Sequence, residues 1–419
     1  MAEIRKYPRT EQDCPAGYKN CDGYIIPDEW SVIRFNSLFK RLTRKNDENN
    51  QNVLTISAQQ GLVSQMDYYN TLYASENKEG YSLLHRGDFS YNKSYSSEYA
   101  YGAIKRLDAY DKGIVSPLYI CFTPQKGTNS DFYLQYFEAG CFNREIYKIA
   151  QEGARNHGLL NVSTEDFFNS MLVFPPLAEQ ERIAEILMQC DKVIELKQKR
   201  IEEEKKKKKY LMQTLLSPTS GVRLPGFSGA WKESRIGDIA KMFSGGTPTS
   251  SNQAYYAVSG IPFIRSGEIS LSKTVLFLSQ AGYNNSAAKM VSKGDLLYAL
   301  YGANSGECFI SKIDGAINQA ILCIRSEIVD TKYMYYVLAN RKEWIVATYL
   351  QGGQGNLSGE IIKNLVISYP EHMEQSAIYS VLNAQDSVID KLEAELSVYR
   401  EKKTALAQLL LTGIVRTKV

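Results

Sequence analysis

The chain contains one long internal repeat, and this repeat constrains the fold more than any other feature. When the sequence is displaced by 195 residues, the stretch 161–218 aligns without a gap with the stretch 356–413, and 18 of the 58 aligned residues are identical. Unrelated sequences of average composition would share roughly three or four identities over that length. The chain therefore consists of two copies of one structural plan.

Weaker matches extend the repeat toward the N-terminal side of each copy. These matches pair Trp30 with Trp231, Gly87-Asp88 with Gly294-Asp295, and Gly113-Ile114-Val115 with Gly315-Ala316-Ile317. The matched positions are spread over most of each half. Each copy is therefore expected to be a globular part followed by a helix.

The two segments that follow the globular parts have the pattern of long helices. Apolar residues recur at spacings of three and four, with charged residues on the opposite face, which predicts helices over Ala178–Leu216 and, in the second copy, up to Gly413. Prolines precede the first helix, and Pro218 with Gly221 ends it. A helix of about 40 residues is ~60 Å long, which exceeds the diameter of one domain. We expect the two helices to pair with each other; packing of each helix on its own domain is the alternative.

The globular parts combine strands with short helices, which indicates the α+β class. Strands are predicted at 52–57, 117–122 and 317–324, and helices begin near 132–137 and 333–338. The predicted fold is two mixed α/β domains separated by two long helices that pair as an antiparallel coiled coil, with a pseudo-two-fold internal repeat. The predicted limits are 1–175 and 217–369 for the globular domains, and 176–216 and 370–419 for the helices.

Composition excludes several classes of protein. The net charge is +3 and 44% of the residues are hydrophobic, as in ordinary globular proteins. No run of eighteen apolar residues occurs, and the first thirty residues contain no apolar stretch, so neither a membrane helix nor a secretory signal is expected. The seven cysteines include no Cys-x-x-Cys pair and there are only three histidines, which predicts reduced cysteines, no metal site and a cytoplasmic location.

Motifs of reactive centres are missing from the sequence. There is no phosphate-binding loop with its lysine, no Gly-x-Gly-x-x-Gly, no Gly-x-Ser-x-Gly and no Asn/Asp-Pro-Pro-aromatic motif. The stretch Gly302–Glu307 has the glycines of a phosphate loop but not the lysine. We therefore predict no catalytic residue and no metal ligand in this chain.

Basic residues gather locally beside tyrosines, amides and hydroxyls. Examples are Lys40–Lys45, the pair Lys105-Arg106 among tyrosines, and Arg265 in the same globular part as the loop Ser244–Thr247. Such sets can bind phosphates while amides and hydroxyls contact base edges. Ordinary surface charge is the alternative, because a net charge of +3 does not by itself indicate a nucleic-acid binder. The run Lys205–Lys209 follows three glutamates and is expected to form a solvated helix face.

Several motifs resemble those of the specificity subunits of type I restriction-modification enzymes, and they occur in the family's order over nearly the whole chain. They are Pro176–Ala184, Met373–Ile378, Leu224–Phe227 followed by Trp231, Gly245–Thr249, Ile261–Ile264, Gly113–Leu118 and Leu409–Gly413. The resemblance implies two target-recognition domains, each reading one half of a bipartite, asymmetric DNA target. It also implies that the helices set the spacer between the halves and dock the methyltransferase subunits.

The resemblance further implies a chain that is not itself an enzyme. Its partners would be double-stranded DNA, two DNA methyltransferase subunits and restriction/translocase subunits. S-adenosylmethionine, and ATP with magnesium for restriction, would be bound by those subunits, and no cofactor is expected here. Docking is expected at the start of each helix, at Glu179, Gln180, Ile183, Leu187, Glu374, Gln375, Ile378 and Leu382.

DNA contacts are predicted at residues that combine charged or polar groups with loop positions. In the first globular domain these are Arg44, Lys45, Asn92, Lys93, Lys105 and Arg106. In the second they are Thr247, Arg265, Ser266, Tyr301, Asn304 and Ser305, and backbone N–H groups of Gly245-Gly246 are expected to bind a phosphate.

Two other functions are compatible with parts of the sequence. A stand-alone site-specific nuclease would need a set of metal-binding carboxylates, which no motif provides. A coiled-coil scaffold that binds only proteins would need the long helices but not the basic loops. Salt-dependent binding to DNA separates the recognition subunit from the scaffold.

Overall fold

The computed structural model describes residues 14–57, 60–71, 74, 77–94, 99–150, 160–350 and 356–417. The chain divides into two compact units, which are unit 1 (Met1–Leu196 with Glu395–Val419) and unit 2 (Lys197–Ala394). The long helices are α6 (Leu177–Leu215) and α11 (His372–Leu411), and each contributes residues to both units. Helix α6 agrees with the predicted range to within one residue, and α11 ends two residues before the predicted end. The domain limits themselves remain a prediction.

The globular part of unit 1 is built on a four-stranded antiparallel sheet with the order β4-β11-β8-β9. Four two-stranded pairs, β1-β2, β12-β3, β10-β7 and β5-β6, accompany this sheet. The strands are β1 (Tyr18–Cys21), β2 (Tyr24–Pro27), β3 (Ser31–Arg34), β4 (Phe39–Arg41), β5 (Leu54–Ser57), β6 (Gly61–Ser64), β7 (Ser82–His85), β8 (Phe89–Asn92), β9 (Ala103–Arg106), β10 (Lys112–Val115), β11 (Ile120–Pro124) and β12 (Met171–Phe174). The helices are α1 (Phe35–Leu38), α2 (Gln65–Tyr69), α3 (Ser130–Glu138), α4 (Asn143–Ile149) and α5 (Thr164–Asn169).

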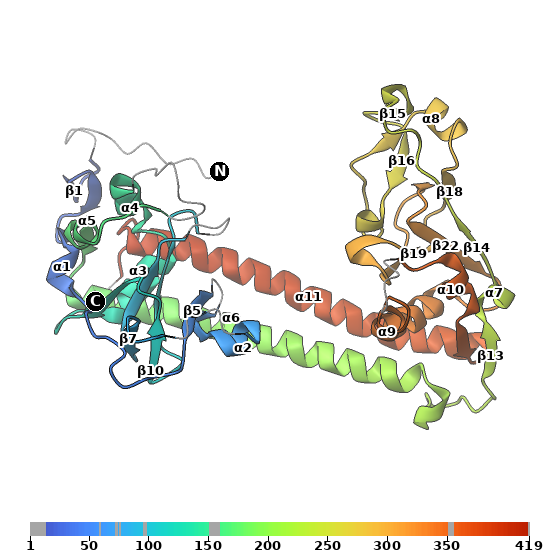
Figure 1. The fold of residues 1–419 in the computed structure, drawn as a ribbon, viewed down its shortest axis with the longest axis horizontal. Coiled ribbons are helices and arrows are strands. Elements are labelled where there is room, and N and C mark those ends of the chain that lie inside the picture. Colours follow the sequence, from blue (N-terminus) through green and yellow to red (C-terminus); the bar gives the residue numbers. More distant parts are fainter. Residues whose placement is uncertain are drawn as a thin grey trace. The chain divides into compact units, whose positions relative to one another are not determined.

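Unit 2 contains a four-stranded sheet with the order β14-β22-β19-β20, a five-stranded sheet with the order β15-β17-β16-β21-β18, and the pair β13-β23 (Figure 1). The strands are β13 (Lys232–Arg235), β14 (Ala240–Ser244), β15 (Tyr256–Ala257), β16 (Ile261–Ile264), β17 (Phe277–Leu278), β18 (Lys289–Val291), β19 (Leu296–Ala299), β20 (Cys308–Ile310), β21 (Gly315–Ile317), β22 (Ile321–Ser326) and β23 (Val366–Tyr369). The helices are α7 (Ile236–Ile239), α8 (Gln280–Asn284), α9 (Thr331–Tyr349) and α10 (Gly359–Asn364), with 3-10 turns η2 (Pro218–Ser220), η3 (Gln253–Tyr255), η4 (Ser266–Glu268) and η5 (Gly302–Asn304).

The repeat in the sequence is matched by a repeat of strand order. In unit 1 the sequence β3-α1-β4 leads into the four-stranded sheet, and in unit 2 the sequence β13-α7-β14 does the same. The orders β4-β11-β8-β9 and β14-β22-β19-β20 then correspond strand by strand. Trp30 and Trp231, which the sequence repeat pairs, each directly precede the first of these strands. The two copies therefore share one local topology.

The two units have different cores, although their topology is shared. In unit 1 the α3 side chains pack on phenylalanines such as Phe35, Phe89 and Phe122, all with no exposed surface. In unit 2 the corresponding helix α9 packs Tyr333, Tyr336 and aliphatic residues against its sheet. An Asn129 side chain caps α3 and an Asp330 side chain caps α9, so these helices start at Ser130 and Thr331, two residues before the predicted Phe132 and Tyr333.

Two of the predicted strands differ from the structure. The stretch 317–324 was expected to be one strand, but it contains the end of β21 and the start of β22, separated by Asn318–Ala320. This expectation is wrong because Gly245 N–H donates to the carbonyl of Asn318, at 3.2 Å, across a turn that apolar patterning does not show. The strand predicted at 117–122 begins only at Ile120, after a turn closed by Tyr119 N–H and the Ser116 carbonyl.

The two long helices contact each other within each unit. In unit 1, Lys403 of α11 lies 2.5 Å from Asp191 of α6. In unit 2, Lys205 of α6 lies 2.9 Å from Glu393 of α11, and Lys208 lies 2.6 Å from Asp386. The predicted solvated face of the lysine run is thus interrupted at Lys208, whose side chain is only 25% exposed.

Candidate nucleic-acid interface

Four strands of unit 2 end at the same edge. Strand β22 is antiparallel to both β14 and β19 and begins where they end. Strand β16 is parallel to β21, and β21 leads directly into β22 through Asn318–Ala320. The segments after β14, β16, β19 and β21 therefore meet. We call these segments the polar edge of unit 2; its polar residues are Thr247, Arg265, Ser266, Tyr301, Asn304, Asn318 and Gln319.

Hydrogen bonds tie the segments of the polar edge together. Thr247 Oγ1 lies 2.8 Å from Gln319 Oε1 and donates to it. The N–H of Leu300, just before Tyr301, donates to the carbonyl of Ala320 at 2.8 Å. The turns η4 and η5 are neighbours, since a Cβ added to Gly267 would lie 3.5 Å from Asn304 Nδ2. The structure therefore brings together the candidates that sequence reasoning had placed in three separate loops.

The glycines beside Thr247 are explained by packing within the chain. A Cβ on Gly245 would lie 1.8 Å from the carbonyl oxygen of Ile317, and a Cβ on Gly246 would lie 2.6 Å from the Cβ and 3.2 Å from the backbone carbons of Ala287. Only glycine permits this approach of one backbone to another. The N–H of Gly245 already donates to Asn318, so this group is engaged inside the unit.

Arg265 is the exposed cation of the polar edge, and its guanidinium is held by a buried carboxylate. Its side chain is 48% exposed, and its Nε and one terminal nitrogen lie 3.2 Å from the two oxygens of Glu268. Thr274 and the N–H of Val275 also donate to Glu268. Burial alone would raise the pKa of Glu268, but the hydrogen bonds from these three residues outweigh it and lower the pKa below its ordinary value of 4.5. Glu268 therefore stays ionised and orients Arg265.

Ser305 differs from the other candidates in unit 2. It is buried, and its hydroxyl donates to the carbonyl of Gly302 at 2.8 Å. This bond closes the η5 turn, so the side chain shapes the loop that carries Tyr301 and Asn304 and does not itself reach the surface.

The candidates in unit 1 are less closely gathered. The Arg44 guanidinium lies 2.5 Å from Asp88 and 2.8 Å from the ring of His85, and Lys45 donates to the carbonyl of Gly80. Asn92 ends β8, where its side-chain oxygen accepts from Ser94 N–H, and Lys93 follows it. Lys45 is exposed, whereas Arg44, Asn92 and Lys93 are half-buried.

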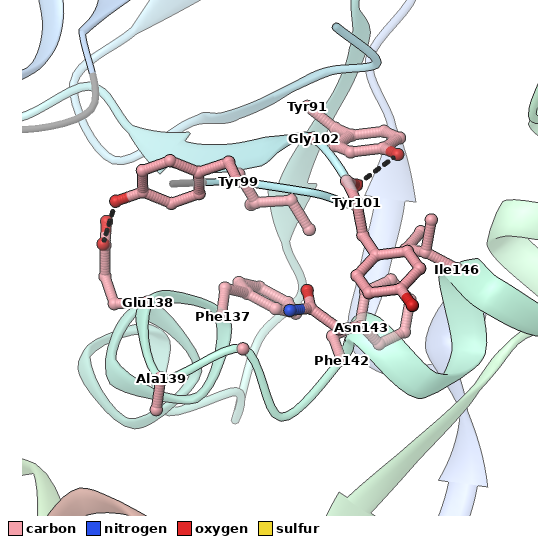
Figure 2. A pocket seen from close by; sticks show the side chains of 12 residues that line it. Tyr91, Tyr99, Tyr101, Gly102, Phe137, Glu138, Ala139, Phe142, Asn143 and Ile146 are labelled. Carbon is pink, nitrogen blue, oxygen red and sulfur yellow. Dashed lines mark hydrogen bonds between the residues drawn. The ribbon is translucent and has the colours of Figure 1, made fainter. Parts of the chain in front are cut away.

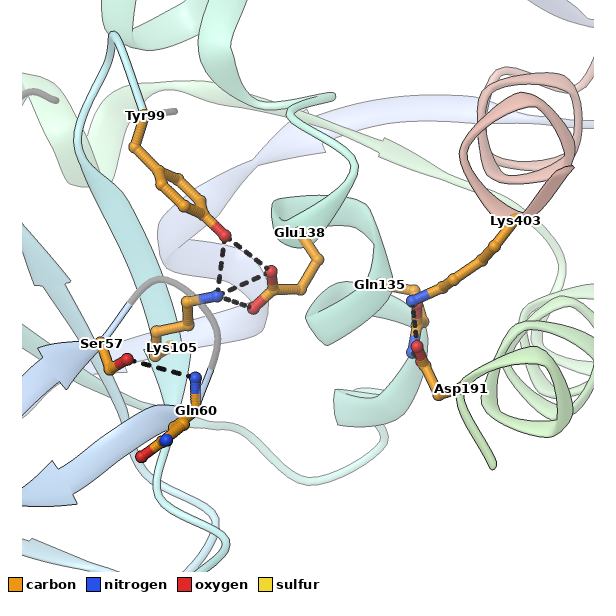
Figure 3. A network of polar contacts seen from close by, with 8 residues as sticks. All are labelled: Ser57, Gln60, Tyr99, Lys105, Gln135, Glu138, Asp191 and Lys403. Atoms are coloured by element: carbon orange, nitrogen blue, oxygen red, sulfur yellow. Dashed lines mark hydrogen bonds and ion pairs between the residues drawn. The ribbon is translucent and has the colours of Figure 1, made fainter. Parts of the chain in front are cut away.

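Lys105 and Arg106 lie on the inner side of unit 1. Lys105 is 4% exposed, and its ammonium donates to both oxygens of Glu138, at 2.6 and 2.8 Å, and to the hydroxyl of Tyr99 (Figure 3). Burial alone would lower the pKa of Lys105, but the charge of Glu138 outweighs it and the pKa is raised. The Arg106 side chain is 13% exposed and pairs with Asp108 and Asp131. Both cations are therefore engaged within the domain, which does not favour direct contact with DNA.

A pocket of about 300 Å³ lies beside Lys105 and opens between β8, β9 and the helices α3 and α4. Its walls are largely aromatic, and Figure 2 shows the hydroxyl of Tyr91 turned toward the carbonyl of Tyr101, to which it donates at 2.9 Å. Tyr99 and Glu138 form the side nearest Lys105. Tyr99 and Glu138 of this wall both accept hydrogen bonds from Lys105.

The residues predicted to dock a partner are all buried in their own units. They are Glu179, Gln180, Ile183, Leu187, Glu374, Gln375, Ile378 and Leu382, with exposures of 0–2%. Glu179 accepts from the Trp30 indole at 2.8 Å and from Arg416 at 2.7 Å. Glu374 accepts from Arg223 at 2.9 Å in the same manner. In this chain these side chains attach each helix to its own globular part, and docking at them stays a prediction.

Sequence reasoning missed two groups of residues. Asn318 and Gln319 belong to the polar edge, but they lie in the stretch 317–324, whose mostly apolar sequence predicts a single strand and no loop. Arg223 and Arg416 lie beyond the ungapped repeat, after the two helices, and the available signal was the Val-Arg pair that both segments share, Val222-Arg223 and Val415-Arg416.

The described parts of the chain contain no group of three or more potential metal-binding side chains. Within the same residues, no helix combines the length and apolar character that crossing a membrane requires.

Two mixed domains that repeat one topology, each joined to long helices and one of them presenting a polar edge, define a modular binding protein. The chain belongs to the family of type I restriction modification DNA specificity domains, since that family's sequence model matches residues 27–205 and 229–398. The chain is thus a specificity subunit with two target-recognition domains, and members of this family are not enzymes; catalysis resides in other subunits of their complexes.

Individual relatives are similar over nearly their whole length. The MjaX and MjaVIII type I restriction enzyme specificity subunits of Methanocaldococcus jannaschii are 26% and 23% identical, over 94% and 96% of this chain and 95% and 96% of their own. A chain from a study of complex assembly in a type I R-M system superposes with a TM-score of 0.58 at 17% identity, covering 94% of this chain and all of that one. The S subunit from M. genitalium gives 0.55 at 14% identity, over 93% and 97%. These two structures support the fold.

Proposed function

We propose that each recognition domain reads one half of a bipartite, asymmetric DNA target, and that the polar edge of unit 2 is the reading surface of the second domain. The observation that carries this proposal is the convergence of a guanidinium, several amides and hydroxyls from four strand ends. An exposed arginine suits a phosphate, and the amides of Asn304, Asn318 and Gln319 suit base edges. The different loops of the two copies account for an asymmetric target.

The long helices are proposed to pair antiparallel and to set the distance between the two half-targets. The contacts between α6 and α11 inside each unit support this role, because Lys205 meets Glu393 while Lys208 meets the earlier Asp386. Residue numbers that rise on one helix as they fall on the other are the pattern of an antiparallel pair. Half-targets one DNA turn apart would be ~34 Å from centre to centre.

Docking of two methyltransferase subunits is proposed for exposed apolar side chains of the helices. Leu196 is 53% exposed and Tyr210 60% exposed on α6, and Val398 is 45% exposed on α11. These side chains are exposed and can contact another protein. The partner subunits would bind S-adenosylmethionine, and a restriction subunit would use ATP and magnesium, in the cytoplasm where the DNA is.

Replacing Arg265 by alanine tests the polar edge. Binding of a complex with its methyltransferase partner to target DNA is measured between 50 and 200 mM salt. We expect Arg265→Ala to weaken binding about tenfold and to lower the slope of log affinity against log salt by about one, because one phosphate contact is lost.

Arg325→Ala is the matched control for this test. Arg325 is 45% exposed and paired with Asp295, as Arg265 is with Glu268, but it lies near the end of β22, whereas the polar edge lies where β22 begins. If Arg325→Ala weakens DNA binding as much as Arg265→Ala does, the polar edge is not the reading surface of the second domain. A wild-type complex whose DNA binding does not depend on salt would favour the protein scaffold, and cleavage of DNA by the purified chain with magnesium would favour the nuclease.

A further inference from the structure

One carboxylate in unit 1 joins three helices. Asp191 of α6 accepts from Lys403 of α11 at 2.5 Å through one oxygen, and from the side-chain amide of Gln135 of α3 at 2.8 Å through the other (Figure 3). Gln135 is 4% exposed and lies between core residues of the globular part. The carboxylate therefore bonds the other long helix on one side and the recognition domain on the other.

Unit 2 contains the same arrangement. Asp386 of α11 accepts from Lys208 of α6 at 2.6 Å, and from the hydroxyl of Tyr336 of α9 at 2.6 Å. Burial and the hydrogen bond to Asp386 both raise the pKa of Tyr336, so its hydroxyl keeps its proton and donates. The Lys208 ammonium also lies 5.8 Å from the centre of the Tyr336 ring.

The internal repeat relates the two arrangements. A displacement of 195 residues places Asp191 on Asp386 and Lys208 on Lys403, and these are identical residues in the alignment. Each arrangement takes its aspartate from one copy and its lysine from the other. The third group, an amide in unit 1 and a phenol in unit 2, comes from the recognition domain of the same unit.

A simple surface ion pair does not account for this pattern. An exposed lysine–aspartate pair contributes little to stability and needs no third partner. Here the second oxygen of each aspartate is used by a buried donor from the domain core. Buried or half-buried polar groups at helix interfaces typically fix register at some cost in stability.

We propose that Asp191 and Asp386 are positioning residues, each of which locks one recognition domain to a single axial position on the two helices. This role rests on the proposed function. In this role the carboxylates of Asp191 and Asp386 determine which length of DNA spacer the complex accepts. A target with one base pair more or fewer displaces a half-site by ~3.4 Å. A domain that followed this displacement would have to break the bond from Gln135 or Tyr336, which spans less than 3 Å.

The experiment measures methylation by the complete complex on DNA whose spacer is one base pair shorter than, equal to, or one longer than that of the natural target. The quantity compared is the preference for the natural spacer over the other two. Asp191→Ala is expected to reduce this preference about tenfold, which is the range of one charge-assisted hydrogen bond. Lys192→Ala is the matched control, because Lys192 is the next residue of α6 and pairs only with Glu195 among the described residues; it should keep the wild-type preference.

A second set of variants covers the case in which Asp191→Ala does not fold. Asp191→Asn and Lys403→Met keep the volume of the side chains and should lower the preference in the same direction. The exchange Asp191→Lys with Lys403→Asp restores the pair, and the amide of Gln135 can accept as well as donate, so the preference should return.

Two outcomes overturn the proposals separately. If the wild-type complex methylates no bipartite target, the proposed function fails. If the wild-type complex prefers one spacer and the folded Asp191 variants keep that preference, the positioning role is wrong while the proposed function stands.

Discussion

At the scale of single residues, the polar edge depends on a carboxylate that points inward. Glu268 holds the guanidinium of Arg265, the hydroxyl of Thr274 and the N–H of Val275, although it is only 8% exposed itself. An ionised buried group is stable only when such partners are present. The loop that carries Arg265 is therefore ordered by an interaction that depends on pH.

The effect of pH on Glu268→Gln follows from this arrangement. The folded-state pKa of Glu268 is lowered from 4.5, so its contribution to stability is complete above pH 4.5 and is lost as the pH falls through the folded-state value. We expect Glu268→Gln to reduce the free energy of unfolding of unit 2 by about 2 kcal/mol at pH 7. Urea unfolding followed by the fluorescence of Trp231 and Trp344 measures it.

The difference between wild type and Glu268→Gln should shrink below pH 4.5. A difference that stays constant between pH 7 and pH 3.5 would show that the charge of Glu268 does not contribute. Binding to DNA should weaken in the variant at pH 7, because Arg265 loses its orienting partner.

Lys105 illustrates what the sequence could not reveal at this scale. Its position among tyrosines and next to Arg106 favoured a surface role, but Glu138, 33 residues later, neutralises it in the interior. Burial of a charge depends on a partner that only the fold brings near. Lys93 and Arg265, by contrast, lie at loop positions that the local sequence had indicated, and Asn92 is the last residue of β8.

At the scale of elements, each long helix is fastened to its globular part by a glutamate in its first turn. Glu179 accepts hydrogen bonds from Trp30 and Arg416, and Glu374 accepts hydrogen bonds from Arg223. The two glutamates are 195 residues apart, and in each case the arginine follows the end of the other helix. The beginning of one helix and the segment after the other are thus bound together in both units.

Arg416→Ala tests this fastening. Glu179 is 2% exposed, so loss of its charged partner leaves a buried carboxylate whose one remaining hydrogen bond among the described residues comes from the Trp30 indole. We expect a loss of about 2 kcal/mol in the free energy of unfolding of unit 1. The fluorescence of Trp30, whose indole bonds the same glutamate, reports the transition.

Arg182→Ala serves as the comparison for Arg416→Ala. Arg182 pairs with Glu185 on the exposed side of α6, where both side chains are about half exposed. A loss of no more than about 0.5 kcal/mol is expected there. Similar losses in the two variants would mean that Arg416 is merely another surface charge.

Helices and strands could be predicted where the same spacing of apolar residues continues over many residues. The helical period persists over about 40 residues in both copies, and prolines mark the first start, so α6 was located within one residue. Asn318–Ala320 could not be located in this way, because apolar residues flank the break and the turn is fixed by Gly245, more than seventy residues earlier. Patterning identifies regular elements, whereas loops are determined by distant hydrogen bonds.

At the scale of the whole molecule, the two copies should be separable in function. We expect that replacing residues 217–369 by the same region of another such subunit changes only one half of the methylated motif. Sequencing of methylated adenines in cells that express the chimera with the methyltransferase partner measures the result. A change in both halves, or a continuous motif for the wild type, would contradict the division of labour between the domains.

Unit 1 is assembled from segments that are distant in the chain. The hydroxyl of Tyr18 donates to the carbonyl of Gly413 at 2.8 Å, and Ala407, Leu410 and Leu411 complete the core around Leu187. During synthesis at 5–20 residues per second, the ribosome needs about 10–40 s to proceed from residue 196 to residue 395. While unit 2 is being synthesised, the nascent unit 1 therefore lacks the last part of its interior, and the apolar surface that Ala407, Leu410 and Leu411 will cover is open to chaperones.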